Sequence, residues 1–147
     1  MIDEQLTSRI IKAFYTVYNS LGHGFLERIY HNAMIIQLVS DGLVIETQKP
    51  IAVLYGENVI GTFSADLVVD EKVIVELKAK EGLHEAHEAQ LTNYLRATDL
   101  EIGLLFNFGK QPEFKRKYFS NRNKRRSKHE TDNILQSLLV ENPPKSA

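Results

Sequence analysis

The sequence contains no cysteine among its 147 residues, which excludes a disulfide framework and a zinc site built on cysteine. It also lacks any apolar run approaching the roughly 18 residues that a membrane-spanning helix requires. The amino-terminal segment MIDEQLTSRI carries two acids and no long apolar stretch, so we expect no signal peptide. A cytoplasmic location is consistent with these absences.

Charge is distributed unevenly along a chain of ordinary composition, with 43% hydrophobic and 25% charged residues. Residues 1–109 have a net charge of −7, whereas residues 110–147 have a net charge of +6. Most of the positive charge lies between Lys110 and Lys128. Such a run can bind phosphates, although a solvated tail fits it equally well. We expect one domain over residues 1–119, followed by a basic C-terminal tail over residues 120–147.

Hydrophobic periodicity predicts an α/β fold with α+β character. Helical spacing of apolar residues predicts helices over 3–21, 25–41 and 84–98, with a further short helix over 131–140 in the tail. In the second helix, one apolar face is expected to contain Leu26, Ile29, Tyr30, Ala33, Ile36 and Gln37. Strands are predicted over 43–49, 51–55, 59–69, 73–79, 100–108 and 113–119, with a turn at Glu57-Asn58. This order predicts a mostly antiparallel or mixed sheet flanked by helices.

The most informative segment runs from Ser64 to Lys78 and contains the pattern Asp-x9-Glu-x-Lys. Side chains alternate along a strand, so Glu76 and Lys78 share one face. A three-residue loop, with Val69 opposite Val73, would place Asp66 across from Glu76, with Cβ atoms about 5 Å apart. A two-residue loop would place the two acids on opposite faces.

Two neighbouring carboxylates repel each other unless a cation lies between them. Their oxygen atoms suit Mg²⁺ or Mn²⁺, and such an ion can activate water and neutralise phosphoryl charge. Lys78 would point into the same site, where it can orient water or stabilise the transition state. The alternative is an exposed, charged hairpin in which Lys78 is merely paired with a carboxylate.

Further candidates lie on the predicted helices. Glu27 borders the apolar face of the second helix, where an acid is also favoured by the helix dipole. The third helix carries a stripe of His87, Gln90, Leu91 and Tyr94, which fits either a site or an amphipathic, partly buried helix. We do not expect His84 and His87 to ligate a metal. His23 and His31 are expected to be surface residues.

Several segments together resemble a known family. Gly24, Glu27 and Tyr30 in GFLERIY fit a Gly-x-x-Glu-x-x-Tyr signature. They are followed in order by ADLVVDEKVIVELKA, HEAQLTNYL and GLLFNFG. Over about residues 5–119 the chain resembles the GxxExxY protein family, a branch of the PD-(D/E)xK nuclease superfamily. The resemblance implies a restriction-endonuclease-like core, with a central mixed sheet flanked by helices.

The resemblance also implies roles for individual residues. Asp66 and Glu76 correspond to the metal-binding acids, and Lys78 to the catalytic lysine. The backbone carbonyl of Leu77 and the carboxylate of Glu27 would complete the metal shell. Gln90 and Tyr94 match a Gln-x-x-x-Tyr motif of exonuclease domains in this superfamily. The usual proline before the first acid is replaced by Ala65.

Three functions remain open from the sequence. The favoured one is a nuclease dependent on Mg²⁺ or Mn²⁺ that hydrolyses phosphodiester bonds of DNA rather than RNA. The expected nucleic-acid contacts are Lys115, Arg116, Lys117, Arg122, Lys124, Arg125 and Arg126. The alternatives are a non-catalytic nucleic-acid-binding module and a protein-interaction module that kept the nuclease fold. A homo-oligomer is also open.

Overall fold

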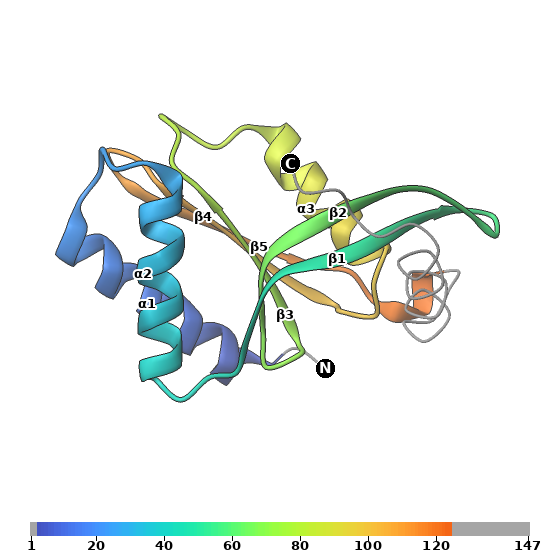
Figure 1. Cartoon of the computed structure of the whole chain (residues 1–147), viewed down its shortest axis with the longest axis horizontal. Coiled ribbons are helices and arrows are strands. Elements are labelled where there is room, and N and C mark those ends of the chain that lie inside the picture. The colour runs from blue at the N-terminus through green and yellow to red at the C-terminus, as the bar shows by residue number, and fades with distance from the viewer. Residues whose placement is uncertain (1–2, 125–147) are drawn as a thin grey trace.

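The computed structural model describes residues 3–124 and arranges them as a mixed sheet with helices on both faces (Figure 1). The elements are α1 (Glu4–Leu21), α2 (Glu27–Ser40), β1 (Ile45–Tyr55), β2 (Asn58–Val69), β3 (Val73–Lys78), α3 (Glu85–Arg96), β4 (Ile102–Phe108), β5 (Pro112–Tyr118) and the short 3₁₀ helix η1 (Asn121–Asn123). The strands lie in the order β1-β2-β3-β4-β5. Only β3 and β4 are parallel, and α3 connects them, as a parallel crossover requires. The predicted mixed sheet is confirmed.

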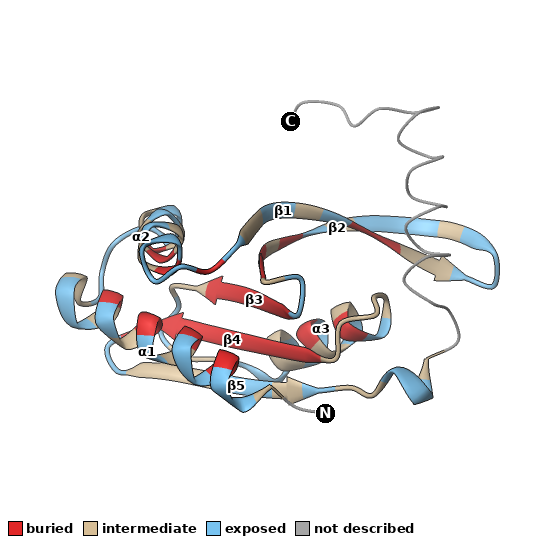
Figure 2. Ribbon diagram, turned by 90° about the horizontal axis from the view of Figure 1, so that it is seen from below, coloured by how far each residue is buried: buried red, intermediate tan, exposed pale blue. Residues whose placement is uncertain are grey.

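Two hydrophobic clusters cover the two faces of the sheet. Helices α1 and α2 pack on one face, where Phe14 stacks on Phe106 with ring centroids 4.4 Å apart. Helix α3 packs on the other face through Leu91 and Leu95. Figure 2 shows β3 and β4 buried between these layers. The central strands β3 and β4 are therefore largely apolar on both faces, with Glu76 and Lys78 on β3 and Asn107 on β4 as the polar exceptions.

The first helix begins and ends where the sequence predicts. The Asp3 carboxylate accepts a hydrogen bond from the Leu6 backbone N–H at 3.0 Å and caps the amino-terminal end. At the other end Gly22 adopts φ +69°, a conformation that favours glycine. Residues Ile10 and Phe14 are fully buried, so the predicted apolar face is the one that packs on the sheet.

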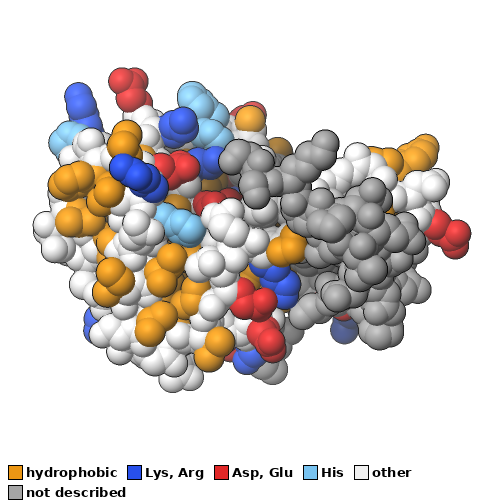
Figure 3. All heavy atoms as spheres, in the orientation of Figure 1, with side chains coloured by type: hydrophobic (Ala, Val, Ile, Leu, Met, Phe, Trp, Pro, Cys, Tyr) orange, Lys and Arg blue, Asp and Glu red, His pale blue; other side chains and the backbone are white. Residues whose placement is uncertain are grey.

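The predicted face of α2 is only partly correct. Tyr30 is fully buried and Ala33 packs against the same cluster, as predicted. The other fully buried residues are Met34 and Leu38, whereas Leu26 and Ile36 are 67% and 71% exposed. Apolar residues lie around most of this helix, so their spacing does not single out one face. Hydrophobic side chains consequently gather on the surface over α2 (Figure 3).

A long hairpin formed by β1 and β2 extends beyond the rest of the sheet (Figure 1). The sequence predicts two strands interrupted near Pro50, but β1 is continuous, because proline is tolerated in an edge strand. The hairpin turn lies at residues 56–57, one residue earlier than predicted. Gln48 adopts φ +50°, and the β1–β2 pairing skips this residue, opposite Asp66, without a change of register.

The predicted helix over 131–140, together with Arg125 and Arg126, lies outside the described residues. Within residues 3–124, no helix is long and apolar enough to cross a membrane.

Candidate active site

The loop between β2 and β3 sets the positions of the two acids. Val69 pairs with Val73 and Leu67 with Val75, so the predicted three-residue loop is confirmed. The loop residues Asp70 and Glu71 both adopt positive φ, and the Lys72 N–H donates to the Val69 carbonyl at 2.9 Å. This register places Asp66 beside Glu76, as predicted.

Asp66 and Glu76 are joined by hydrogen bonds between side chains and backbone. The Leu77 N–H donates to Asp66 Oδ2 at 2.9 Å, and the Asp66 N–H donates to Glu76 Oε1 at 3.3 Å. The regular β2–β3 pairing ends at Leu67 and Val75, so the carboxyl groups accept hydrogen bonds just where the two strands diverge. Each acid is thereby held in position by the other's strand.

Burial and repulsion from Asp66 strongly perturb the pKa of Glu76. Its side chain is 8% exposed, and its pKa is raised to about 9, chiefly by burial and next by the negative charge of Asp66. Lys78 lowers the pKa of Glu76 only slightly by comparison. Two hard oxygen donors that resist joint ionisation are a suitable donor set for a divalent cation.

Lys78 lies on the same strand and face as Glu76, two residues further on. Its ammonium group influences Glu76 and also lowers the pKa of His87, after burial, which is the larger cause. His87 Nδ1 in turn accepts a hydrogen bond from the His84 backbone N–H at 3.2 Å, within the cap of α3. The Lys78 charge therefore acts both on the acid pair and on the first turn of α3.

The polar stripe on α3 is only partly directed at the acids. Burial raises the pKa of the Tyr94 hydroxyl, and the charges of Glu76 and Asp66 raise it further, so this ring lies within electrostatic reach of both. Tyr94 also stacks on Phe63, with centroids 3.6 Å apart. Gln90 is exposed, and its side-chain amide makes no hydrogen bond within residues 3–124. This amide is therefore available to a ligand.

Two of the three residues in the Gly24-Glu27-Tyr30 segment have structural roles. Gly24 adopts φ +108°. The fully buried Tyr30 donates its hydroxyl to the Gly22 carbonyl at 2.7 Å and accepts from the Phe25 N–H at 3.1 Å. These contacts fix the turn between α1 and α2. Glu27 has no such structural contact among the described residues, and it is exposed in the first turn of α2.

Glu27 does not join the acid pair directly. Within the described chain, no three Asp, Glu or His side chains lie close enough to hold one metal ion together. Glu27 raises the pKa of His87, opposing the lowering by Lys78, so it lies on the same side of the molecule as Lys78. Figure 3 shows charged and histidine side chains gathered between the start of α2 and α3.

His31 is a site residue that the sequence interpretation missed. It is half-buried rather than a surface residue, and its Nε2 lies 3.3 Å from the Asp66 carbonyl oxygen. The expectation was wrong because periodicity along α2 does not show which residue faces β2. A usable signal was its position four residues after Glu27, which places both on one side of the helix.

The predicted basic contacts are divided between the two faces of the sheet. Lys115 and Lys117 pair with Leu105 and Gly103 on the α3 face, and Lys117 Nζ lies 2.6 Å from a Glu88 carboxylate oxygen. Arg116 projects from the opposite face, next to Leu104. In the segment after β5, Arg122 is exposed on η1 and Lys124 donates to the Leu100 carbonyl at 2.7 Å.

A five-stranded mixed sheet covered by helices on both faces, with two acids and a lysine on adjacent strands, defines a restriction-endonuclease-like α/β fold. The sequence model of the PD-(D/E)XK nuclease superfamily matches residues 4–117. The chain therefore belongs to this nuclease superfamily. Comparisons with curated proteins and with solved structures gave no significant match.

Proposed function

We propose that this protein is a metal-dependent nuclease that hydrolyses phosphodiester bonds of DNA in preference to RNA. The observation that carries the proposal is the pairing of Asp66 and Glu76, whose carboxyl groups accept hydrogen bonds across the point where β2 and β3 diverge. A purely structural role does not require two acids here, because one buried carboxylate beside another is unfavourable without a cation or a proton.

Asp66 and Glu76 would hold Mg²⁺ or Mn²⁺, which prefer oxygen ligands and retain several waters. The chemistry that such a cation supplies when bound is activation of water and neutralisation of phosphoryl charge. We further propose that the Leu77 carbonyl and Glu27 complete the ligand set. Because Glu27 stands apart from the acid pair, we expect it to act through a bound water or at a second cation.

The remaining residues position the reactants. The Lys78 ammonium group would stabilise negative charge on the phosphate in the transition state. Gln90 and the Tyr94 hydroxyl would donate hydrogen bonds to phosphate oxygens beside the acid pair. His31 would hold the backbone of Asp66 through its contact with the carbonyl oxygen, so it is a positioning residue.

Within the superfamily, we propose membership of the GxxExxY branch. The structural parts of the signature, Gly24 and Tyr30, form a fixed turn that holds Glu27 at the start of α2. A fixed turn that carries one exposed acid suits a signature that serves a site.

The test is cleavage of labelled single- and double-stranded DNA and RNA, with Mg²⁺, Mn²⁺ or a chelator. We expect cleavage only with metal, and a loss of about 100-fold or more in Glu76→Gln and Lys78→Ala. Glu57→Gln in the hairpin turn is the control and should retain activity. Cleavage that persists in Glu76→Gln would come from a contaminant and would remove the proposal. Binding without cleavage in every metal would favour the non-catalytic module.

A further inference from the structure

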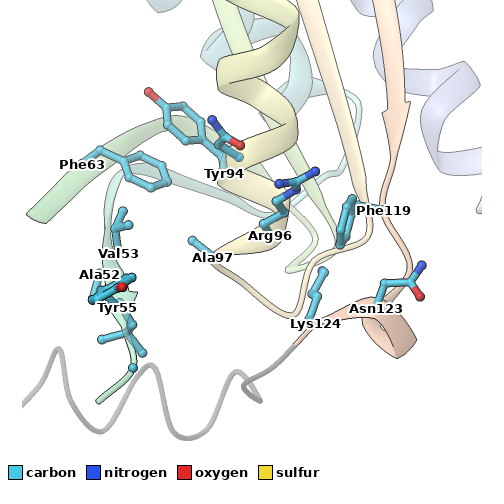
Figure 4. Close-up of a pocket in the computed structure, with 13 residues that line it drawn as sticks. Ala52, Val53, Tyr55, Phe63, Tyr94, Arg96, Ala97, Phe119, Asn123 and Lys124 are labelled. Carbon is cyan, nitrogen blue, oxygen red and sulfur yellow. The ribbon is translucent and has the colours of Figure 1, made fainter. Parts of the chain in front are cut away.

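A groove of about 1210 Å³ opens between the β1–β2 hairpin and α3 (Figure 4). One wall is the outer part of the β1–β2 hairpin. The other consists of the second half of α3 and the chain that follows β5. The side chains of chemical interest in its lining are Tyr55, Phe63, Tyr94, Arg96, Phe119 and Lys124. Four are aromatic and two are cationic, and no acid lines the groove within the described chain.

Tyr94 connects the groove to the candidate active site. It lines the groove, and the charges of Glu76 and Asp66 both act on its hydroxyl. Its ring stacks on Phe63 of the hairpin, so the stacked pair forms one end of the groove. Phe63 precedes Asp66 by three residues on β2, so among the hairpin residues that line the groove it lies toward the acid pair.

The cationic groups are arranged over an aromatic ring at the far end. The Arg96 guanidinium lies 5.1 Å from the Phe119 ring centroid, and Lys124 Nζ lies 5.9 Å from it. Arg96 is exposed and forms no ion pair with any residue of the described range. No acid between residues 3 and 124 consequently neutralises the Arg96 charge.

The opposite wall offers a second stacking surface. Tyr55 at the end of β1 is 75% exposed although it lines the groove. An exposed tyrosine at a hairpin tip contributes little to folding, because its ring is not removed from water. Figure 4 shows that Tyr55 comes from the wall facing Arg96.

We propose that this groove binds single-stranded nucleic acid, with bases stacking on Tyr55 and on the Arg96–Phe119 pair and with phosphates contacting Arg96 and Lys124. Base stacking on aromatic and guanidinium planes, combined with cations along the backbone, is the way single strands are bound without sequence readout. A duplex keeps its bases stacked on each other and offers these rings nothing to stack on. This inference deepens the proposed nuclease function and rests on it for the role of the acid pair.

The experiment measures binding separately from cleavage. The full chain carrying Glu76→Gln is titrated, with a chelator present, against labelled oligothymidylate, oligouridylate and a blunt DNA duplex of equal length. Fluorescence anisotropy reports affinity. Tyr55→Ala and Arg96→Ala are added to this background, with Ile60→Ala on the same hairpin and Lys12→Ala on α1 as matched controls. All four positions are exposed, and circular dichroism confirms folding.

We expect Tyr55→Ala and Arg96→Ala each to weaken single-strand binding about fivefold to 100-fold, with little effect on the duplex and none in the controls. Unchanged single-strand affinity would overturn the inference, as would equal losses on strand and duplex. Comparison of oligothymidylate with oligouridylate shows whether the groove prefers single-stranded DNA or RNA.

Failure of this inference is distinguishable from failure of the nuclease function. If wild-type protein cleaves DNA and Tyr55→Ala and Arg96→Ala leave kcat/KM unchanged, the groove proposal falls while the nuclease stands. If the groove binds single strands as expected but wild type cleaves nothing in any metal, the groove stands and the nuclease proposal falls.

Discussion

Asp66 and Glu76 each accept a hydrogen bond from the backbone of the strand that carries the other acid or of the other acid itself. Glu76 Oε1 accepts from the Asp66 N–H, and Asp66 Oδ2 accepts from the Leu77 N–H. These contacts hold the buried Glu76 beside the half-buried Asp66. These hydrogen bonds stabilise the backbone, whereas the two carboxylates repel each other unless a cation binds between them or one of them is protonated.

This arrangement predicts an unusual pH dependence in metal-free protein. The pKa of Glu76 is raised from 4.5 to about 9 in the folded chain, so the folded state retains a proton that the unfolded state loses. Wild type should lose stability relative to Glu76→Gln as pH rises from about 4.5 to 9, and the difference should stay constant above that range. Thermal unfolding at pH 5, 7 and 9 with a chelator measures it.

The same pair of proteins tests metal binding. Mn²⁺ should raise the Tm of wild type at pH 7 and have little effect on Glu76→Gln, because a ligand that binds only the folded state stabilises it. Glu57→Gln is the control and should behave as wild type in both measurements. Identical pH slopes for wild type and Glu76→Gln would contradict the buried, perturbed acid.

Lys78 lowers the pKa of His87 and Glu27 raises it. Substitution of either residue tests this. Lys78→Met should raise the pKa of His87, because a nearby positive charge that lowers it is removed. Glu27→Gln should lower that pKa further. Titration of the imidazole resonances by NMR measures both, with Lys12→Met as a control. No movement of His87 in either variant would show that the three residues do not share one site.

Tyr30→Phe tests the turn that precedes Glu27. The hydroxyl donates to the Gly22 carbonyl and accepts from the Phe25 N–H, and the ring is fully buried. Its removal should lower the free energy of unfolding by about 1–3 kcal/mol, because buried partners are left unsatisfied. Denaturant unfolding measures the loss. Tyr55→Phe, at a ring that is 75% exposed, should have almost no effect.

Gly103→Ala tests how closely α3 approaches the sheet. A Cβ at this position would lie 2.8 Å from Leu91 Cδ1, and Leu91 is itself 1% exposed. The helix would have to shift, at a cost of about 1–3 kcal/mol, and nuclease activity should fall because Tyr94 lies on the same helix. Gly61→Ala, where nothing lies within 4 Å, is the matched control. Equal stability of the two variants would show that α3 packs loosely.

The sequence predicts that Asp66 lies beside Glu76, because the two acids are close together in the chain. Asp66 and Glu76 lie on consecutive strands, and alternation together with loop length fixes which side chains meet. The paired valines on either side of the loop show that the predicted register is correct. Helix α1 is predicted equally well, since its apolar residues lie on one face only.

Other features depend on contacts between distant segments and are not visible in local patterns. The face of α2 is selected by the sheet, and its apolar residues alone do not indicate Met34 or Leu38. The contact of His31 with the Asp66 backbone joins residues 35 positions apart. The groove likewise brings Tyr55 of β1 near Arg96 of α3, and no spacing rule connects them.

Residues 53–62 of the β1–β2 hairpin belong to neither hydrophobic cluster. The next residue, Phe63, packs against the cluster that contains Leu91. Changes in this stretch should therefore leave the folding of the acid-bearing strands almost untouched. Substitutions in the hairpin can then change what the proposed groove binds without altering the acid pair. Substrate preference and catalytic competence would be separable traits in this chain.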